Sequence, residues 1–288
     1  MEERTIERIS RQRTGDHLIW HGGEVPYLTF ASLDAFPWLG HAYATRIGGV
    51  STGEMGTMNL SLHGLAADPE AVTENYRRIA GAVGFDWQKT VGASQVHGTK
   101  IARVGEEDAG SGVVRQNVFN EEDGFVTDTP GLTLCVYFAD CVPLFAVDPV
   151  HHAIGSAHSG WRGTVGGIGT KLVEKMQREF GSDPEDLVCA IGPSICQDCY
   201  EVGGEVAEEF SRNYTAEEAE RLLYPNKKGR YQLDLPMACY FNFLKAGVKE
   251  ENISLTDICT CCEKELIFSH RGSAPGKHGL SAGFLFIR

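Results

Sequence analysis

The sequence is poor in basic residues. It contains 26 Lys and Arg against 39 Asp and Glu, which gives a formal net charge of −13 at pH 7. Nucleic-acid binding draws most of its affinity from clustered Lys and Arg that meet phosphates, so this balance argues against a nucleic-acid partner. A single buried arginine can still bind a small anion whatever the net charge is, so a small-molecule ligand stays open.

The sequence also lacks a long apolar stretch. The longest one, Leu132 to Val147, is interrupted by Asp140 and Pro143 and is shorter than the roughly 20 apolar residues of a membrane span. The first 25 residues lack the apolar segment of a secretory signal. Nine cysteines are an odd number, so we expect reduced thiols, some of them metal ligands, rather than a disulfide framework. These absences predict a cytoplasmic protein that does not enter a membrane.

Two kinds of pattern predict the fold. Asp68 followed by Pro69 and an apolar periodicity predicts a helix that ends near Gly84, and a second periodic run predicts a helix over 165–180. Two further helices are predicted over 205–212 and 235–246. Apolar runs without alternation predict strands buried on both faces; they lie at 100–104, 124–127, 132–138, 144–147, 153–157, 187–191 and 283–287. We therefore expect an α+β (layered α/β) domain of mixed sheets flanked by helices.

Three segments place reactive side chains where an apolar strand meets a turn. They are residues 94–98, 139–143 and 157–163, which carry His97, Cys141 and His158. Imidazole nitrogen and thiolate sulfur are ligands that zinc prefers, and three protein ligands leave a fourth position open for water. On the residues alone, a buried Cys141 and two hydrogen-bonded histidines are the simpler interpretation, because no local motif fixes the spacing.

Further motifs change this interpretation. They are Thr45-Arg46-Ile47-Gly48-Gly49-Val50-Ser51, Met58-Asn59-Leu60, Ala190-Ile191-Gly192-Pro193-Ser194-Ile195, Cys199-Tyr200-Glu201-Val202-Gly203 and Phe268-Ser269-His270-Arg271. With the three segments above, the chain resembles the YfiH/LACC1 family, formerly called multicopper polyphenol oxidoreductases or laccase-domain proteins. The resemblance runs from about Arg46 to the C-terminus. It implies one catalytic domain over 36–288 after an N-terminal extension at 1–35, with the layered fold of the cytotoxic necrotizing factor catalytic domain.

The resemblance also implies a metal and a reaction. Zinc would be held by His97, Cys141 and His158, with copper as the other possible metal. Family members are purine nucleoside phosphorylases that cleave adenosine, inosine and S-methyl-5′-thioadenosine with phosphate to the free base and a (methylthio)ribose 1-phosphate, and they also deaminate adenosine. Zinc acidifies a water that could attack C6 of adenine, and Asp140 is our candidate for the proton shuttle. The expected partners are a nucleoside and phosphate; no oligomeric state is predicted.

Five residues are candidates for contacts with the substrate. Arg46 is the first choice for phosphate, because its guanidinium can bind an anion at two points and the glycines beside it let backbone N–H groups approach. Arg162 and Arg271 are second choices, and each is equally well explained as a structural clamp. Asn59 and Gln95 could read a purine edge through their amides or could satisfy loop backbone groups.

The remaining cysteines form two clusters in the sequence. Cys196 and Cys199 make a C-x-x-C pair, and Cys259, Cys261 and Cys262 lie close together. Neighbouring residues of a strand point to opposite faces, so we expect most of these cysteines to pack in the core rather than to form a second metal site.

Three alternative functions stay open. Cys141 could be a nucleophile with His158 as its base, as in a Cys-His hydrolase related to the toxin domain. A zinc amidase that edits cell-wall precursors would use the same site. A copper-dependent polyphenol oxidase needs many more histidine ligands in paired motifs than are visible in the sequence. Chelation separates the first alternative from a zinc enzyme, because it leaves a thiol hydrolase active. His63 is left without an assigned role.

Overall fold

Two six-stranded sheets form the centre of the molecule. The computed structural model describes residues 18–62, 68–226 and 229–288. The first sheet has the order β1 (Leu18–His21), β2 (Tyr27–Phe30), β3 (Leu39–Ala44), β15 (Ser281–Ile287), β7 (Thr133–Phe138) and β4 (Thr90–Val91). The second has the order β14 (Ile253–Leu255), β10 (Val188–Ile191), β8 (Val142–Asp148), β9 (Ala153–Ser159), β6 (Glu122–Thr127) and β5 (Lys100–Arg103). Both sheets mix antiparallel and parallel pairs.

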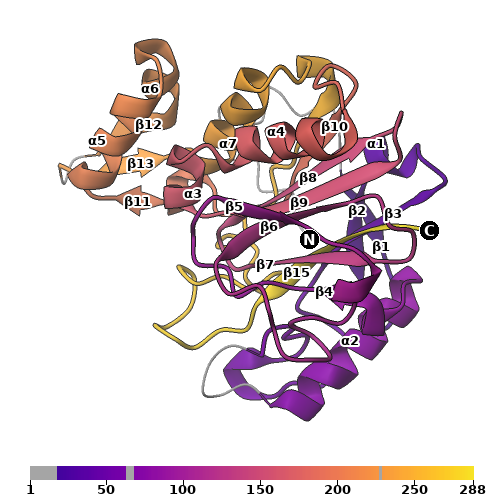
Figure 1. Cartoon of the computed structure of the whole chain (residues 1–288). Coiled ribbons are helices and arrows are strands. Elements are labelled where there is room, and N and C mark those ends of the chain that lie inside the picture. The colour runs from indigo at the N-terminus through magenta and orange to yellow at the C-terminus, as the bar shows by residue number, and fades with distance from the viewer. Residues whose placement is uncertain (1–17, 63–67, 227–228) are drawn as a thin grey trace.

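Helices cover the outer faces of the two sheets (Figure 1). Helix α2 (Pro69–Val83) packs on the first sheet, and α4 (Ile168–Phe180) and α7 (Leu235–Lys245) pack on the second. At one side stand α5 (Gly204–Asn213), α6 (Ala216–Leu222) and a small sheet of β11 (Glu201–Val202), β13 (Tyr231–Leu233) and β12 (Leu223–Pro225). The described residues also form the short helices α1 (Ala31–Asp34) and α3 (Trp161–Val165) and several 3-10 turns of three residues each. The predicted layered α+β domain is confirmed.

The helix boundaries follow the capping residues. The Asp68 side chain accepts hydrogen bonds from the N–H groups of the first turn of α2, and Gly84 ends that helix with φ of +92°. Of the helix predicted over 165–180, only residues 168–180 form α4, because Gly167 takes a left-handed φ of +74° and separates α4 from α3, which ends at Val165. The remaining part ends at Gly181, as predicted.

The core lies in three apolar layers, one between the sheets and one under each helical face. Between the sheets, Tyr43 stacks on Phe145 with ring centroids 4.8 Å apart. Every residue of β7, β8, β9 and β15 is buried, which explains their apolar runs without alternation. Each large side chain buried here contributes about 1.5–3 kcal/mol. The ends of β7, β8 and β9 are therefore fixed points on which a site can be built.

Residues 18–34, within the expected N-terminal extension, pack onto the domain. They form β1, β2 and α1, and β2 pairs with β3 through Tyr27 and Ala44. Residues 1–17 and His63 lie outside the described part of the chain. Within the described ranges, no helix is long and apolar enough to cross a bilayer.

Candidate metal centre and active-site pocket

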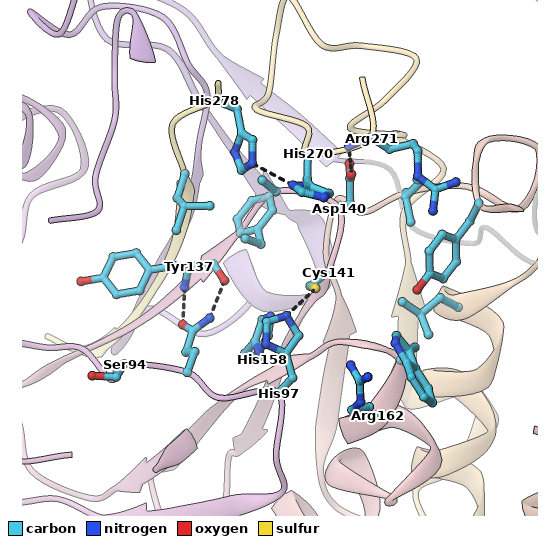
Figure 2. Close-up of a pocket in the computed structure, with 18 residues that line it drawn as sticks. Ser94, His97, Tyr137, Asp140, Cys141, His158, Arg162, His270, Arg271 and His278 are labelled. Atoms are coloured by element: carbon cyan, nitrogen blue, oxygen red, sulfur yellow. Dashed lines mark hydrogen bonds between the residues drawn. The ribbon is translucent and has the colours of Figure 1, made fainter. Parts of the chain in front are cut away.

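Three segments meet at one edge of the sheets and bring His97, Cys141 and His158 together. Cys141 lies in the turn between β7 and β8, His158 lies near the end of β9, and His97 lies in the loop between β4 and β5. The Nε2 atom of His97 is 3.7 Å from Sγ of Cys141. One ligand atom from each of the three residues lies within 4.8 Å of the others, and Figure 2 shows their side chains converging. The three residues could therefore hold a metal ion.

A buried carboxylate positions two of these ligands. Asp123 Oδ1 accepts hydrogen bonds from Nδ1 of His158 at 2.8 Å and from the backbone N–H of His97 at 3.0 Å. Its Oδ2 accepts from the N–H groups of Val96 at 3.2 Å and Gly98 at 2.7 Å. A carboxylate that holds the second nitrogen of a metal-binding histidine fixes the ring and its tautomer. The sequence prediction did not include Asp123.

The backbone around the cluster is tightly constrained. His97 adopts a left-handed φ of +61°, a conformation that ordinary residues occupy only where surrounding contacts enforce it. A Cβ added at Gly160 would lie 2.5 Å from Cδ2 of His97 and 3.3 Å from Sγ of Cys141. Gly160 is therefore needed for the close approach of the three ligands.

Cys141 and His158 shift each other's pKa. Burial opposes the thiolate, but attraction and hydrogen bonding to His158, with a contribution from His97, lower the pKa of Cys141 to about 6. Burial likewise opposes the imidazolium, but the Cys141 thiolate and Asp123 raise the pKa of His158 to about 9. The thiolate form of Cys141, which binds soft metals and acts as a nucleophile, is thus favoured near neutral pH.

The cluster lies in a cavity of about 520 Å³, which is within the range of small-ligand sites. Its apolar and aromatic wall comprises Tyr137, Phe138, Trp161, Ile195, Tyr200, Leu235 and Leu280. Two arginines and two further histidines also line it, namely Arg162, Arg271, His270 and His278. The cavity thus combines an apolar wall, a potential metal centre and several cationic or proton-donating groups.

Both arginines proposed as second choices for phosphate reach the pocket. The guanidinium of Arg162 lies 4.3 Å from the ring centroid of Trp161 and has no hydrogen-bond or ion-pair partner within the described part of the chain. Nη1 of Arg271 donates to the carbonyl of Glu201 at 3.1 Å, and its guanidinium lies 5.4 Å from the ring centroid of Tyr200. Arg162 therefore has the greater capacity to bind an anion.

Two predicted substrate contacts lie outside the pocket lining. Nε and Nη2 of Arg46 donate to the carbonyl of Gly56, and Nη1 donates to the carbonyl of Lys264 at 2.7 Å. Asn59 is buried, donates to the carbonyl of Ser61 and accepts from the N–H of Leu280. The structure therefore places Arg46 and Asn59 as clamps of loop backbone and not beside the metal centre.

Gln95 and Asp140 line the pocket, but their polar atoms bond to its wall. The amide of Gln95 pairs with the backbone N–H and C=O of Tyr137 at 2.7 and 2.8 Å. Asp140 accepts hydrogen bonds from the Thr260 hydroxyl, the Ser269 hydroxyl and the N–H of Arg271, each at 2.6 Å. Both side chains join segments that lie far apart in the sequence.

Two pocket histidines were not among the predicted site residues. Nδ1 of His270 and Nε2 of His278 are 3.0 Å apart, so the two rings share a hydrogen bond inside the pocket. His270 lies in the Phe268–Arg271 motif, which was the only signal for it in the sequence. Nothing local marks His278, because its position depends on how the loop 272–280 folds back.

The comparisons with known proteins show the family of the chain. Residues 40–288 match the family described as multi-copper polyphenol oxidoreductase laccase. The chain belongs to this laccase family. One relative is the purine nucleoside phosphorylase YlmD of Geobacillus stearothermophilus, which is 37% identical over 228 residues. The match covers 79% of this chain and 82% of that relative. The chain is 34% identical over 210 residues to the adenosine deaminase RL5 of an unknown prokaryotic organism, covering 72% of this chain and 77% of that one.

Solved structures show the same fold. The crystal structure of YlmD from Geobacillus stearothermophilus matches with a TM-score of 0.87 and 33% identity, and the match covers 94% of this chain and 100% of that chain. The layered arrangement of this laccase-family chain is therefore that of YlmD.

The donor set at the centre of this laccase-family domain fits one metal ion. Two imidazole nitrogens and one thiolate suit zinc, and they also suit copper. Nδ1 of His158 donates a hydrogen bond to Asp123, and metal-binding histidines usually make such a bond to a carboxylate with their second ring nitrogen. The described residues contain one further group that could hold a metal, and it consists of cysteines alone.

That second group corrects the prediction for the remaining cysteines. Cys196, Cys199, Cys259 and Cys262 place their sulfur atoms within 4.8 Å of one another. The argument from strand alternation does not apply, because residues 260–266 form turns rather than a strand. A bridge between Ser194 and Cys259 joins the two segments, whose cysteines are 63 residues apart in the chain. The four thiols thereby form one cluster that could hold a metal.

Proposed function

We propose that this protein is a zinc-dependent purine nucleoside phosphorylase that also deaminates adenosine. One observation carries the proposal: the His97–Cys141–His158 cluster shares its pocket with an arginine whose donors are available to an anion. The relatives named as purine nucleoside phosphorylase and adenosine deaminase support it. The proposed substrates are adenosine, inosine and S-methyl-5′-thioadenosine with phosphate, and the products are the free base and the corresponding pentose 1-phosphate.

Zinc is the metal we propose for the centre. When bound, it supplies a Lewis acid that polarises an oxygen of the substrate or of water at the pocket floor. A multicopper oxidase requires several histidine-containing centres. The described residues form only one histidine-containing group of three or more possible ligands, which favours a single, redox-inactive ion.

Arg162 is the proposed phosphate ligand. Its guanidinium is held against Trp161 at 4.3 Å, and this contact orients the plane while its N–H groups stay available. A planar guanidinium binds two phosphate oxygens at once, which places the anion for attack on C1′ of the ribose. Arg46, the first choice from the sequence, is engaged by two backbone carbonyls, so we assign it to the stability of the loop.

The His270–His278 pair is the proposed proton donor to the departing purine. In phosphorolysis a phosphate oxygen bonds to C1′ while the C1′–N9 bond breaks and its electron pair passes to the purine. The purine then takes up a proton, and an imidazole in the pocket can donate it. The 3.0 Å contact between Nδ1 of His270 and Nε2 of His278, and the 2.9 Å contact of Nδ1 of His278 with the carbonyl of Gly279, orient the two rings. Nε2 of His270, in its protonated form, is therefore the proposed donor atom. Asp140, whose carboxylate accepts three hydrogen bonds from the wall, is assigned to positioning instead of proton transfer.

A Cys-His hydrolase is the second candidate, because Asp123, His158 and Cys141 form a hydrogen-bonded series in the order of a triad. A triad does not require His97, whose Nε2 lies 3.7 Å from the same sulfur. A second imidazole nitrogen at this position favours the metal centre. A zinc amidase would use the same residues and is the alternative if no nucleoside reacts.

The experiment incubates the purified protein with adenosine, with and without phosphate, and follows adenine, inosine and ribose 1-phosphate by mass spectrometry. His97→Ala is the control for the metal centre. We expect phosphate-dependent adenine and phosphate-independent inosine from the native protein and neither from the variant. Absence of turnover of any purine nucleoside would contradict the proposal, and activity that survives chelation would favour the Cys-His hydrolase.

A further inference from the structure

Two C-x-x-C pairs come together behind the pocket wall. Cys196 and Cys199 form one pair, and Cys259 and Cys262 form the other. Thr260 and Cys261 are the two residues between the members of the second pair. Pairs of this spacing are typical of structural zinc sites, in which each pair supplies two of four thiolates. The nine cysteines form no disulfide bond, so all four sulfur atoms are available as ligands.

The sulfur positions suit a tetrahedral ion. Zn–S bonds of about 2.3 Å place thiolates about 3.8 Å apart. The four sulfurs lie within 4.8 Å of one another, and Sγ of Cys199 is 3.5 Å from Sγ of Cys262. A disulfide bond requires about 2.05 Å, so the observed separation corresponds to the edge of a metal tetrahedron and not to a bond.

Backbone N–H groups already point at the sulfur of Cys259. The N–H of Cys196 lies 3.2 Å from it and the N–H of Cys262 lies 3.4 Å from it. Such donors stabilise the negative charge of a metal-bound thiolate and fix its direction, which is the role of outer contacts at metal sites. Two of the four cysteines are buried, whereas Cys199 is half-buried and Cys262 is exposed, which leaves a path for an ion from solvent.

We propose that Cys196, Cys199, Cys259 and Cys262 bind a structural zinc ion that ties the loop after β10 to the loop after β14. Binding displaces the thiol protons to solvent and forms four Zn–S bonds. With four protein ligands the site is closed, so it has no position for substrate. This second site is separate from the His97–Cys141–His158 centre and does not depend on the reaction proposed above.

The position of the cluster gives the ion its role. The two loops meet Asp140, which accepts from Thr260 on one loop and whose carbonyl accepts from the N–H of Ile195 at 3.0 Å on the other. Asp140 directly precedes Cys141, and Tyr200 follows Cys199 into the pocket lining. A zinc ion at this point would hold the wall that faces the active centre, so its ligands act as positioning residues.

The test counts metal in the full-length protein. Protein purified under reducing conditions without chelators is analysed for zinc and iron by mass spectrometry, alongside His97→Ala, Cys199→Ser and Cys261→Ser. Cys261 is the matched control, because it is adjacent to Cys262 but outside the group of four. We expect two zinc ions per chain in the native protein, one in each of the first two variants, and two in Cys261→Ser. One zinc ion in the native protein and none in His97→Ala would overturn the proposal, as would iron in the four-cysteine site.

A second measurement does not depend on whether Cys199→Ser folds. His97→Ala is treated with iodoacetamide before and after removal of metal by a strong chelator, and the alkylated peptides are mapped. We expect the four cysteines, including the exposed Cys262, to become reactive only after chelation. Alkylation of Cys199 and Cys262 without chelation, or a disulfide bond between any of the four, would overturn the zinc assignment.

Discussion

Replacement of Asp123 by Asn separates its role at the metal centre from its role in stability. The carboxylate accepts four hydrogen bonds, two at each oxygen. Whichever way the Asn amide is turned, its NH₂ group faces two N–H donors. Two bonds to a charged acceptor are therefore lost, at about 1.5–3 kcal/mol each, or roughly 3–6 kcal/mol in total. His158 then either faces the NH₂ group and loses its orienting partner, or keeps only a neutral amide oxygen in place of a carboxylate. Zinc affinity should therefore fall by roughly 10- to 100-fold.

Asp148→Asn is the matched control for this substitution. Asp148 is also buried and accepts from the N–H groups of Val150 and His151 and from the imidazole of His151, but it does not line the pocket. Urea unfolding should show both variants to be destabilised by a few kcal/mol, whereas competition with a chromophoric chelator should show weakened zinc binding only in Asp123→Asn. Equal zinc affinity in the two variants would refute the role of Asp123 in orienting His158.

Three further predictions test other parts of the account. Arg162→Ala should raise KM for phosphate by roughly 10- to 150-fold, because about 1.5–3 kcal/mol of charge-assisted bonding is lost. Deamination should stay intact in this variant. Arg46→Ala, assayed in parallel, should lower thermal stability without changing the KM for phosphate. Gly160→Ala should displace His97 and reduce the metal content measured by elemental analysis. Burial opposes the charge of Asp148, but its hydrogen bonds outweigh this effect and lower its pKa. The carboxylate therefore stabilises the fold above about pH 4, and this contribution is lost as the pH falls. The stability of Asp148→Asn, measured between about pH 5 and 3, should consequently fall less steeply than that of the native protein.

The long helices α2, α4, α5 and α7 and most of the central strands could be predicted from the sequence because their signals are local. Asp68 and Gly84 mark the two ends of α2, and the buried runs of β7, β8 and β9 contain few polar residues. Several strands of two to four residues, namely β1, β2, β4, β11, β12, β13 and β14, were not predicted, because they gain their structure from pairing with other strands. The six-residue strand β3 in the middle of the first sheet was missed as well. The order of strands within each sheet depends on the same long-range contacts.

The proposed metal ligands could be predicted only through the family resemblance, since His97, Cys141 and His158 come from separate segments. Asp123 escaped prediction because its partners lie 26 and 35 residues away in the chain. The glycine-rich turn around Arg46 resembled an anion site, but the side chain is long enough to reach two backbone carbonyls instead. Arg46 therefore shows that the residue type and its neighbours do not determine where a flexible side chain binds.

The most direct test of the central claim is reconstitution of the metal-free enzyme. The protein is stripped with a chelator, checked for retained secondary structure by circular dichroism, and reloaded with measured amounts of zinc before assay with adenosine and phosphate. We predict no activity without metal, and formation of adenine and ribose 1-phosphate in a one-to-one ratio that rises with the zinc bound at His97, Cys141 and His158. Undiminished turnover by the metal-free protein, or adenine released without ribose 1-phosphate, would contradict the account.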